Sequence, residues 1–214
     1  MCGRSPEGAV IRMQPFTRLT AVAAPMELPN IDTDRIIPAR FLRRPRESGV
    51  GPLLFHDVRF DATGGERADF VLNRPAYREA RMLVTAENFG CGSSREMAVW
   101  ALVDHGIRVV IGPSFGDIFF ENCFKNGLLA IVVPGEIASD LRSALAVRPG
   151  TTLTVDLEAQ TIVGAAGAPI RFEVDAFRKH GLLTGRDELA LTLEHLPAIE
   201  AFEARRRVEM PWLG

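Results

Sequence analysis

The segment from Asn88 to Ala98, NFGCGSSREMA, holds residue types that can bind and activate a small anion. Gly90 and Gly92 permit positive φ angles and a close approach of the backbone to a ligand. Arg95 carries a planar guanidinium that can grip a carboxylate through two parallel hydrogen bonds. If a helix begins here, its free N–H groups and its dipole add to the attraction for negative charge. The pattern therefore predicts an anion-binding turn.

The same residues support a simpler interpretation. Ser93-Ser94-Arg95-Glu96 also matches a capping box, in which Ser93 bonds the backbone three residues on and Glu96 reaches back. Such a cap stabilises a helix by about 1 kcal/mol and needs no ligand. The turn matches neither a P-loop nor the GxSxG sequence of a nucleophile elbow. Spacing alone leaves the ligand-binding and the capping interpretation equally open.

Buried strands and helices alternate around this turn. Short apolar runs predict strands at 81–86, 108–111 and 128–133, and helical spacing predicts helices at 95–105 and 114–126. Nearly continuous apolar strands joined by helices are typical of a parallel sheet that is covered on both faces. We therefore expect an α/β fold, with the turn at the carboxyl edge of the strands, where ligands of open sheets usually bind.

Further elements flank this core. Upstream, NIDTDRIIPARFL (30–42) has turn-forming Asn and Asp residues, and an exposed loop rich in Arg, Pro and Gly follows it at 42–51. Downstream, the pattern predicts a helix at 136–147, strands at 151–157, 161–163 and 170–174, and a helical stretch at 187–207 that Pro197 breaks in two. Residues 1–15 lack periodicity and are expected to form a flexible extension, with 16–214 as a single domain.

Composition argues against several classes of partner. A net charge of −2 over 214 residues gives no reason to expect a nucleic-acid or anionic-membrane surface. No apolar stretch reaches the length of a membrane span and the N-terminus shows no signal pattern, so we expect a cytoplasmic protein. The three cysteines, Cys2, Cys91 and Cys123, form no CxxC pair, so no metal is expected on this chain.

Motifs along most of the chain resemble the small subunit of 3-isopropylmalate dehydratase, the separate-chain counterpart of the aconitase swivel domain. NFGCGSSRE is preceded by NIDTDRIIPARFL and followed by VVIGPSFGDIF at 109–119. The likeness continues through FVLN at 70–73, DLEAQ at 156–160, and DAFRKHGLLTG to LTLEH at 175–195. The GSSRE and DTD blocks in this order are highly specific. The resemblance implies an aconitase-type swivel domain, with a parallel-sheet core, flanking helices and additional β-strands.

The resemblance also implies a two-protein hydro-lyase. In this family the large subunit holds a [4Fe–4S] cluster through its own cysteines, and one iron acts as a Lewis acid, so this chain is expected to bind no cofactor. By motif position, Ser93 would be the base that removes the proton alpha to a carboxylate, while Ser94 and Arg95 would hold substrate carboxylate. Asp34 would support the acid–base network by pairing with a group of the large subunit. A serine base must act as an alkoxide, which the helix N-terminus and Arg95 can stabilise.

Two positions depart from the family pattern. Met97 stands where a histidine usually follows SSRE. The loop that selects the substrate's side group reads RESG at 46–49, where bacterial members tend to have Lys-Arg-Thr-Gly, so Glu47 places a carboxylate where a cation is expected. The loop residues that remain as candidates for substrate contact are Arg43, Arg44 and Arg46.

The leading interpretation of the chemistry is interconversion of 2-isopropylmalate and 3-isopropylmalate through isopropylmaleate, a step of leucine biosynthesis. A paralogous small subunit for citramalate, dimethylmalate or homocitrate stays open, because these diacids differ by groups worth only about 1–3 kcal/mol of discrimination. A non-catalytic anion-binding module is the third interpretation. The joint presence of Ser93, Ser94, Arg95 and Asp34 argues against it.

Overall fold

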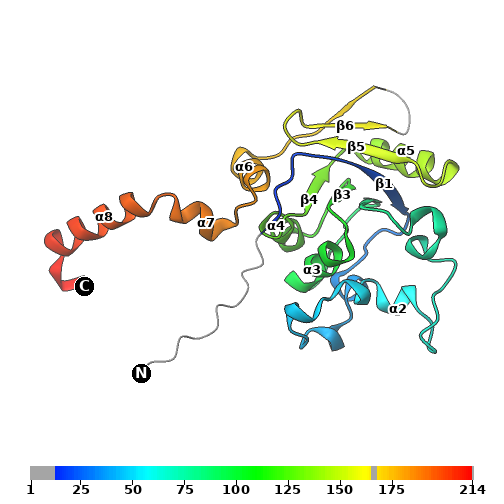
Figure 1. Cartoon of the computed structure of the whole chain (residues 1–214), viewed down its shortest axis with the longest axis horizontal. Coiled ribbons are helices and arrows are strands. Elements are labelled where there is room, and N and C mark those ends of the chain that lie inside the picture. Colours follow the sequence, from blue (N-terminus) through cyan, green and yellow to red (C-terminus); the bar gives the residue numbers. More distant parts are fainter. Residues whose placement is uncertain (1–12, 165–167, 214) are drawn as a thin grey trace.

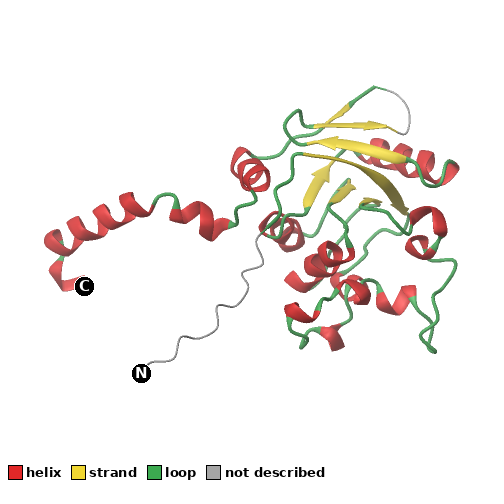
Figure 2. Cartoon of the chain, in the orientation of Figure 1, coloured by secondary structure: helices red, strands yellow, loops and turns green. Residues whose placement is uncertain are grey.

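The computed structural model describes residues 13–164 and 168–213, which form a seven-stranded mixed sheet with flanking helices (Figure 1, Figure 2). The strand order is β4-β3-β2-β1-β5-β6-β7. The strands are β1 (Arg18–Met26), β2 (Met82–Thr85), β3 (Val109–Gly112), β4 (Leu129–Val132), β5 (Thr152–Asp156), β6 (Thr161–Gly164) and β7 (Ile170–Arg171). Pairing is parallel from β4 to β1 and antiparallel from β1 to β7.

The helices connect and cover these strands. They are α1 (Thr33–Ile36), α2 (His56–Arg59), α3 (Glu96–His105), α4 (Asp117–Lys125), α5 (Gly135–Val147), α6 (Ala176–Thr184), α7 (Glu188–Leu193) and α8 (Leu196–Glu209). Helix α5 packs on β1, β2 and β3, while α3 and α4 pack on each other on the opposite side of the sheet (Figure 1). The predicted α/β core with a parallel sheet covered on both faces is confirmed.

Strand β1 belongs to both halves of the sheet. Its second half, from Ala23 to Met26, pairs with β2 in parallel, and its first half, from Arg18 to Val22, pairs with β5 in antiparallel register. The first half is partly exposed and the second half is buried, and the sequence pattern predicted no strand over either half. The loop that leaves Met26 therefore starts beside the loop that leaves β2.

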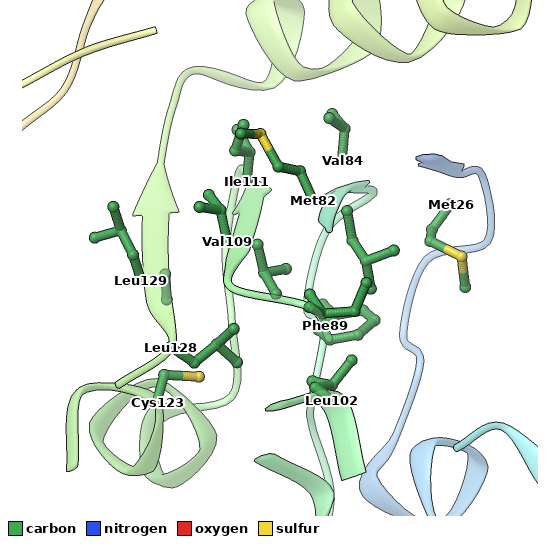
Figure 3. Packing of buried hydrophobic residues seen from close by; sticks show 14 of the residues in the cluster. Met26, Met82, Val84, Phe89, Leu102, Val109, Ile111, Cys123, Leu128 and Leu129 are labelled. Atoms are coloured by element: carbon green, nitrogen blue, oxygen red, sulfur yellow. The ribbon is translucent and has the colours of Figure 1, made fainter. Parts of the chain in front are cut away.

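The core lies between the sheet and its helices. Met82 and Ile111 pack together on the side that faces α5, whereas Leu102 of α3 and Cys123 of α4 lie on the other side (Figure 3). All four residues are completely buried, and burial of a large aliphatic side chain stabilises a fold by about 1.5–3 kcal/mol. This packing fixes where the loops at the carboxyl edge of the sheet begin.

Helix α3 follows the turn formed by residues 88–95, which we call the serine turn. Met97, Ala98, Val99, Ala101 and Leu102 are its buried residues, and their spacing gives one apolar face. The helix ends at Gly106, whose left-handed backbone lets its N–H bond the carbonyls of Leu102 and Val103.

Most predicted elements are found, and some boundaries differ. The helix expected at 114–126 begins only at Asp117, because the Ser114 hydroxyl accepts a hydrogen bond from Asn88 N instead of joining a helical turn. The stretch 187–207 does form two helices, but the break lies at 194–195. Pro197 sits in the first turn of α8, where its missing N–H costs nothing. Helix α6 was not predicted, although Asp175 caps its start and Gly185 its end.

The two ends of the described chain differ in their contacts. Residues 1–12 of the expected extension lie outside the described residues, and Gln14 accepts two hydrogen bonds from the guanidinium of Arg108, at 2.8 and 3.0 Å. At the other end α7 and α8 project from the body as an arm, and α8 has no buried residue (Figure 1). In the described ranges, no helix has the length and apolar character needed to cross a membrane.

Candidate functional site

The turn after β2 depends on glycine at two positions. Gly90 and Gly92 have φ angles of +74° and +91°, a region that L side chains rarely adopt. A Cβ at Gly90 would also lie 2.2 Å from Cγ of Phe119, so this position has no room for a side chain. The predicted need for both glycines is explained by backbone conformation, and at Gly90 by packing as well.

The DTD segment holds the turn from one side. Thr33 N donates to the Cys91 carbonyl at 2.9 Å, and the Thr33 hydroxyl donates to the Ser93 carbonyl at 2.8 Å. Gly90 N in turn donates to the Ile31 carbonyl at 2.7 Å. The two segments thus run side by side, with an isolated parallel bridge between Asp32 and Cys91.

The loop after β3 holds the turn from the other side. Gly116 N donates to the Phe89 carbonyl at 3.0 Å, and a Cβ at Gly116 would lie only 2.5 Å from the Gly90 carbonyl oxygen. A second isolated parallel bridge joins Phe89 to Phe115. The loops that leave β1, β2 and β3 therefore meet at the carboxyl edge of the parallel strands, where the sequence placed the ligand site.

The capping-box interpretation of Ser93 is wrong. Helix α3 begins at Glu96, its N-cap position is Arg95, and it has no side-chain cap hydrogen bond. Ser93 and Ser94 precede the cap and are exposed, and within the described residues neither hydroxyl has a hydrogen-bond partner. The physical reason is that Ser94 and Arg95 continue the turn, which moves the helix start beyond the reach of Ser93. Both hydroxyls are free for other partners.

Arg95 is anchored by Asp34. Its Nη1 donates to Asp34 Oδ1 in an ion pair, and the Arg95 side chain is only 14% exposed while that of Asp34 is 54% exposed. The sequence motif assigned Asp34 a partner on another chain, and the structure gives it a partner on its own chain. The turn and the DTD segment thus bring together four of the predicted residues, which are Ser93, Ser94, Arg95 and Asp34.

The loop arginines have different surroundings. The guanidinium of Arg44 lies 5.6 Å from the centroid of the Phe41 ring. Arg46 lies 4.7 Å from the Trp100 ring and donates from Nη1 to Asn126 Oδ1 at 3.2 Å. Arg43 is exposed, and in the described part of the chain it has no hydrogen bond, ion pair or ring contact. No described contact joins any of the three to the serine turn.

The base of this loop is fixed by a separate ion pair. Arg40 Nη1 donates to Asp57 Oδ2 at 2.7 Å, and this guanidinium lowers the pKa of the Asp57 carboxyl to about 2. The Arg40 guanidinium also lies 4.5 Å from the Phe41 ring, which packs against His56 at 5.1 Å. The start of the loop is therefore ordered by side chains that the motif comparison had not singled out.

A small pocket opens beside Ser93. It has a volume of about 190 Å³ and is lined by Gly90, Gly92, Ser93, Gly116, Asp117, Ile118 and Phe119. Larger cavities of about 540 to 660 Å³ lie elsewhere on the molecule, and none of them is lined by a serine of the turn. Ligand sites usually enclose about 300–1,000 Å³, so the pocket at Ser93 alone is too small to surround a substrate.

The described residues offer no metal-binding set. Among them, no group of three or more His, Cys, Asp or Glu side chains is placed to hold a metal ion. Cys123 is completely buried, and burial raises the pKa of its thiol, whereas Cys91 is half-buried in the turn. His105 ends helix α3 and His180 is exposed on α6.

Two observations qualify the motif assignment. Met97 is 7% exposed and packs in the core, as its side chain predicts. Thr33 was missed by sequence reasoning, although it lies between the two aspartates of the DTD block. The sequence feature that could have identified Thr33 is its position directly after a helix-capping residue. Asp32 caps α1 by accepting a hydrogen bond from Arg35 N at 2.7 Å.

Family models cover most of the chain. The aconitase C-terminal domain matches residues 13–136, the LeuD_N model matches 140–176, and the C-terminal domain of the 3-isopropylmalate dehydratase small subunit matches 190–214. The first match alone spans more than half of the chain and includes the entire serine turn. The aconitase-type fold that the motifs implied is thereby confirmed.

Individual relatives agree with these models. The 3-isopropylmalate dehydratase small subunit of Dinoroseobacter shibae is 56% identical over 201 residues, which is 94% of this chain and 100% of the relative. That of Rhodospirillum centenum is 54% identical over 200 residues, covering 94% and 98%. The crystal structure of 3-isopropylmalate dehydratase from Methanocaldococcus jannaschii superimposes with a TM-score of 0.62 at 25% identity, covering 86% of this chain and 99% of that one. The chain therefore belongs to the family of 3-isopropylmalate dehydratase small subunits.

Proposed function

We propose that this chain is the small subunit of a hydro-lyase that interconverts 2-isopropylmalate and 3-isopropylmalate, and that Ser93 is its base. The observation that carries the proposal is the arrangement of the turn. Two hydroxyls without partners in the described chain precede an arginine that is already oriented by Asp34. Relatives that are 54–56% identical over nearly the whole chain carry the matching name.

The base role requires a free hydroxyl near positive charge. Ser93 Oγ does not cap α3, so its lone pairs are available to a substrate C–H. Arg95 and the unpaired N–H groups at the start of α3 provide the positive potential that stabilises an alkoxide. In dehydration, the Ser93 alkoxide takes the proton from the carbon alpha to a carboxylate, the C–H electron pair forms the double bond, and hydroxide leaves the neighbouring carbon. Return of the proton from Ser93 Oγ to this hydroxide gives water and restores the alkoxide, beside the unsaturated diacid.

The carboxylate-binding role falls to Ser94 and Arg95. One Nη of Arg95 is used by Asp34, and the remaining N–H groups of its guanidinium fork can bond a substrate carboxylate. Asp34 is half-exposed, so its second oxygen stays accessible to a group of the large subunit. Asp34 thus orients Arg95 and supports the acid–base network at the same time.

Among the loop arginines, we propose Arg43 as the residue that faces substrate. Arg40 is held by Asp57, Arg44 lies against Phe41, and Arg46 lies against Trp100. Arg43 alone among these four has no described partner. An arginine without a partner in the unbound subunit loses no existing contact when it binds an anion.

The site is completed by another chain in this proposal. The pocket at Ser93 is too small to enclose a diacid, and the family name of the relatives is that of a small subunit. A [4Fe–4S] cluster on the large subunit would supply Lewis-acid assistance to the departing hydroxide. We expect the complex to work in the cytoplasm, where a small diacid metabolite is available.

Reconstitution tests this function. The full chain is mixed with its iron-reconstituted large subunit, and the ultraviolet absorbance of the unsaturated diacid is followed with 2-isopropylmalate, citramalate, dimethylmalate and homocitrate. We expect 2-isopropylmalate to be turned over best, and the chain without its partner to be inactive. Preference for another diacid would overturn the substrate assignment, and no turnover of any of the four would leave an anion-binding module.

A further inference from the structure

Asn126 uses every hydrogen-bonding position of its side-chain amide. Its Oδ1 accepts from Trp100 Nε1 at 2.9 Å and from Arg46 Nη1 at 3.2 Å. Its Nδ2 donates to Glu96 Oε1 at 2.8 Å and to the Asn122 carbonyl at 2.9 Å. Indole and guanidinium groups are donors only, and carboxylates and carbonyls are acceptors only, so a single amide orientation satisfies all four partners.

These contacts exceed what a helix end requires. Asn126 is the C-cap of α4, and its backbone N–H already bonds the carbonyls of Cys123 and Phe124. The cap is therefore complete without the side chain. The half-buried amide instead reaches α3 twice and the arginine-rich loop once, which joins three separate segments.

One of these segments leads directly to the proposed active site. Glu96 is the first residue of α3 and follows Arg95, whose guanidinium pairs with Asp34. A hydrogen bond from Asn126 to the Glu96 side chain restrains the first turn of α3. Because Arg95 is the N-cap of that turn, its backbone is restrained as well.

The second segment is the loop. Arg46 of the loop is stacked on Trp100 of α3. A second contact follows four residues later in the loop and in the helix, where Val50 N donates to Asp104 Oδ2 at 3.0 Å. Trp100 and Asp104 lie one helical turn apart on α3, so the helix holds the loop at two successive points. Arg46 is thereby an anchor of the loop, and Asn126 fixes the first of the two points.

We propose that Asn126 is a positioning residue that sets the serine turn and the arginine-rich loop in register with each other. This inference rests on the proposed function, because it assigns the turn to catalysis and the loop to substrate recognition. Displacement of reacting groups by about 1 Å can cost up to about 100-fold in rate even when the altered residue is remote. An effect of Asn126 on turnover is therefore expected without contact with substrate.

The test exchanges the amide and the carboxylate. Asn126→Asp keeps the acceptor for Trp100 and Arg46 but places a second carboxylate against Glu96. We expect kcat/KM of the reconstituted complex to fall on the order of 10-fold or more. Glu96→Gln alone keeps an acceptor and is expected to change kcat/KM by less than about 3-fold. The double variant restores a donor to the pair and is expected to recover to within about 3-fold of wild type.

Asn122→Ala is the matched control, because the hydrogen bond from Asn126 to this residue uses its backbone carbonyl, which the substitution keeps. A second readout needs no activity. In a Trp212→Phe background Trp100 is the remaining tryptophan, and its indole N–H resonance in the full chain is expected to shift in Asn126→Asp, which turns its acceptor into a carboxylate, but not in the control.

The outcomes separate the two proposals. Asn126→Asp is also expected to lower the amide protection of residues 90–96 in hydrogen exchange, and the double variant is expected to restore it. If Asn126→Asp matches wild type in kcat/KM, or if the double variant recovers neither rate nor this protection, the positioning role is wrong. If Ser93→Ala keeps full turnover, or no diacid is turned over, the proposed function fails. The Trp100 resonance and the exchange pattern still report on Asn126 in that case.

Discussion

Arg95 donates from Nη1 to Asp34 Oδ1, and the two residues stand 61 positions apart in the chain. The pair joins the segment after β1 to the start of α3. An ion pair with one half-exposed partner contributes only about 0–1 kcal/mol to stability, so its larger effect is to fix the direction of the guanidinium. The side chain that would bind substrate carboxylate is thus oriented before substrate arrives.

Replacement of Asp34 by asparagine is expected to lower turnover more than stability. The new amide would still accept from Arg95 but would lack the charge, and one charge-assisted hydrogen bond of about 1.5 kcal/mol corresponds to about 10-fold in rate. Steady-state kinetics of the reconstituted complex and thermal unfolding of the chain measure both effects. Asp140→Asn, which alters an exposed carboxylate on α5, is the control and should leave both unchanged. A large loss of stability with normal kinetics would contradict the orienting role.

Replacement of Ser93 by alanine is expected to abolish turnover while leaving the fold intact. General acid–base groups contribute about 100- to 10,000-fold, and Ser93 caps no helix, so its hydroxyl has no structural task. The melting temperature should match that of Ser143→Ala, which alters an exposed serine on α5 and serves as the control. A melting temperature well below this control would show that the Ser93 hydroxyl stabilises the turn after all.

Replacement of Gly90 by alanine is expected to destabilise the chain far more than replacement of Gly49. Both have positive φ angles, +74° and +68°, but only at Gly90 would the new methyl group meet Phe119, at 2.2 Å from Cγ. Overpacking adds about 1–3 kcal/mol to a backbone cost of about 1 kcal/mol that both variants share. Urea unfolding of the two variants gives the difference directly. Equal losses would mean that Phe119 moves aside freely.

Stability is expected to fall in mild acid through His105. Burial, reinforced by the Arg59 guanidinium, lowers the pKa of His105 from 6.5 to about 4. Between these values the unfolded chain binds a proton that the folded chain does not, so this contribution is full above pH 6.5 and is lost toward pH 4. The size is on the order of 2 kcal/mol, because partial exposure reduces the full value.

Urea unfolding near neutrality and in mild acid measures this contribution. His105→Gln should lose less stability on acidification than the wild type, whereas His180→Gln, which replaces an exposed histidine, should behave like the wild type. Identical acid sensitivity of His105→Gln and the wild type would contradict the assignment.

Local sequence was sufficient where packing and pattern agree. Val109, Val110 and Ile111 form an apolar run, and they are completely buried in a central parallel strand. The positive φ angles of Gly90 and Gly92 were also predicted from the sequence. The residues that were assigned by motif, Asp34 and Arg95, were brought together by the fold, although their direct pairing is a tertiary contact that no local pattern encodes.

The errors have a common physical cause. The capping box failed because spacing fixes neither where a turn ends nor which donor a hydroxyl meets. Strand β1 was not predicted, because Arg18 and Thr20 become strand residues only through pairing with β5, more than 130 positions later. The sequence did not distinguish Arg46 from the other arginines of the loop, because its stacking on Trp100 depends on where the fold places α3, which is distant in the chain.

The shared strand β1 also determines the order in which the molecule can be completed. β1 is made early, yet its first half has no partner until residues 152–156 leave the ribosome. Until then one edge of the nascent sheet offers unpaired N–H and C=O groups, which favour association with other chains. A truncated chain that ends before β5 would still contain the serine turn, Arg95 and Asp34. Because its sheet edge stays unpaired, we expect proteases and chaperones to bind it, and we expect it not to form an active subunit.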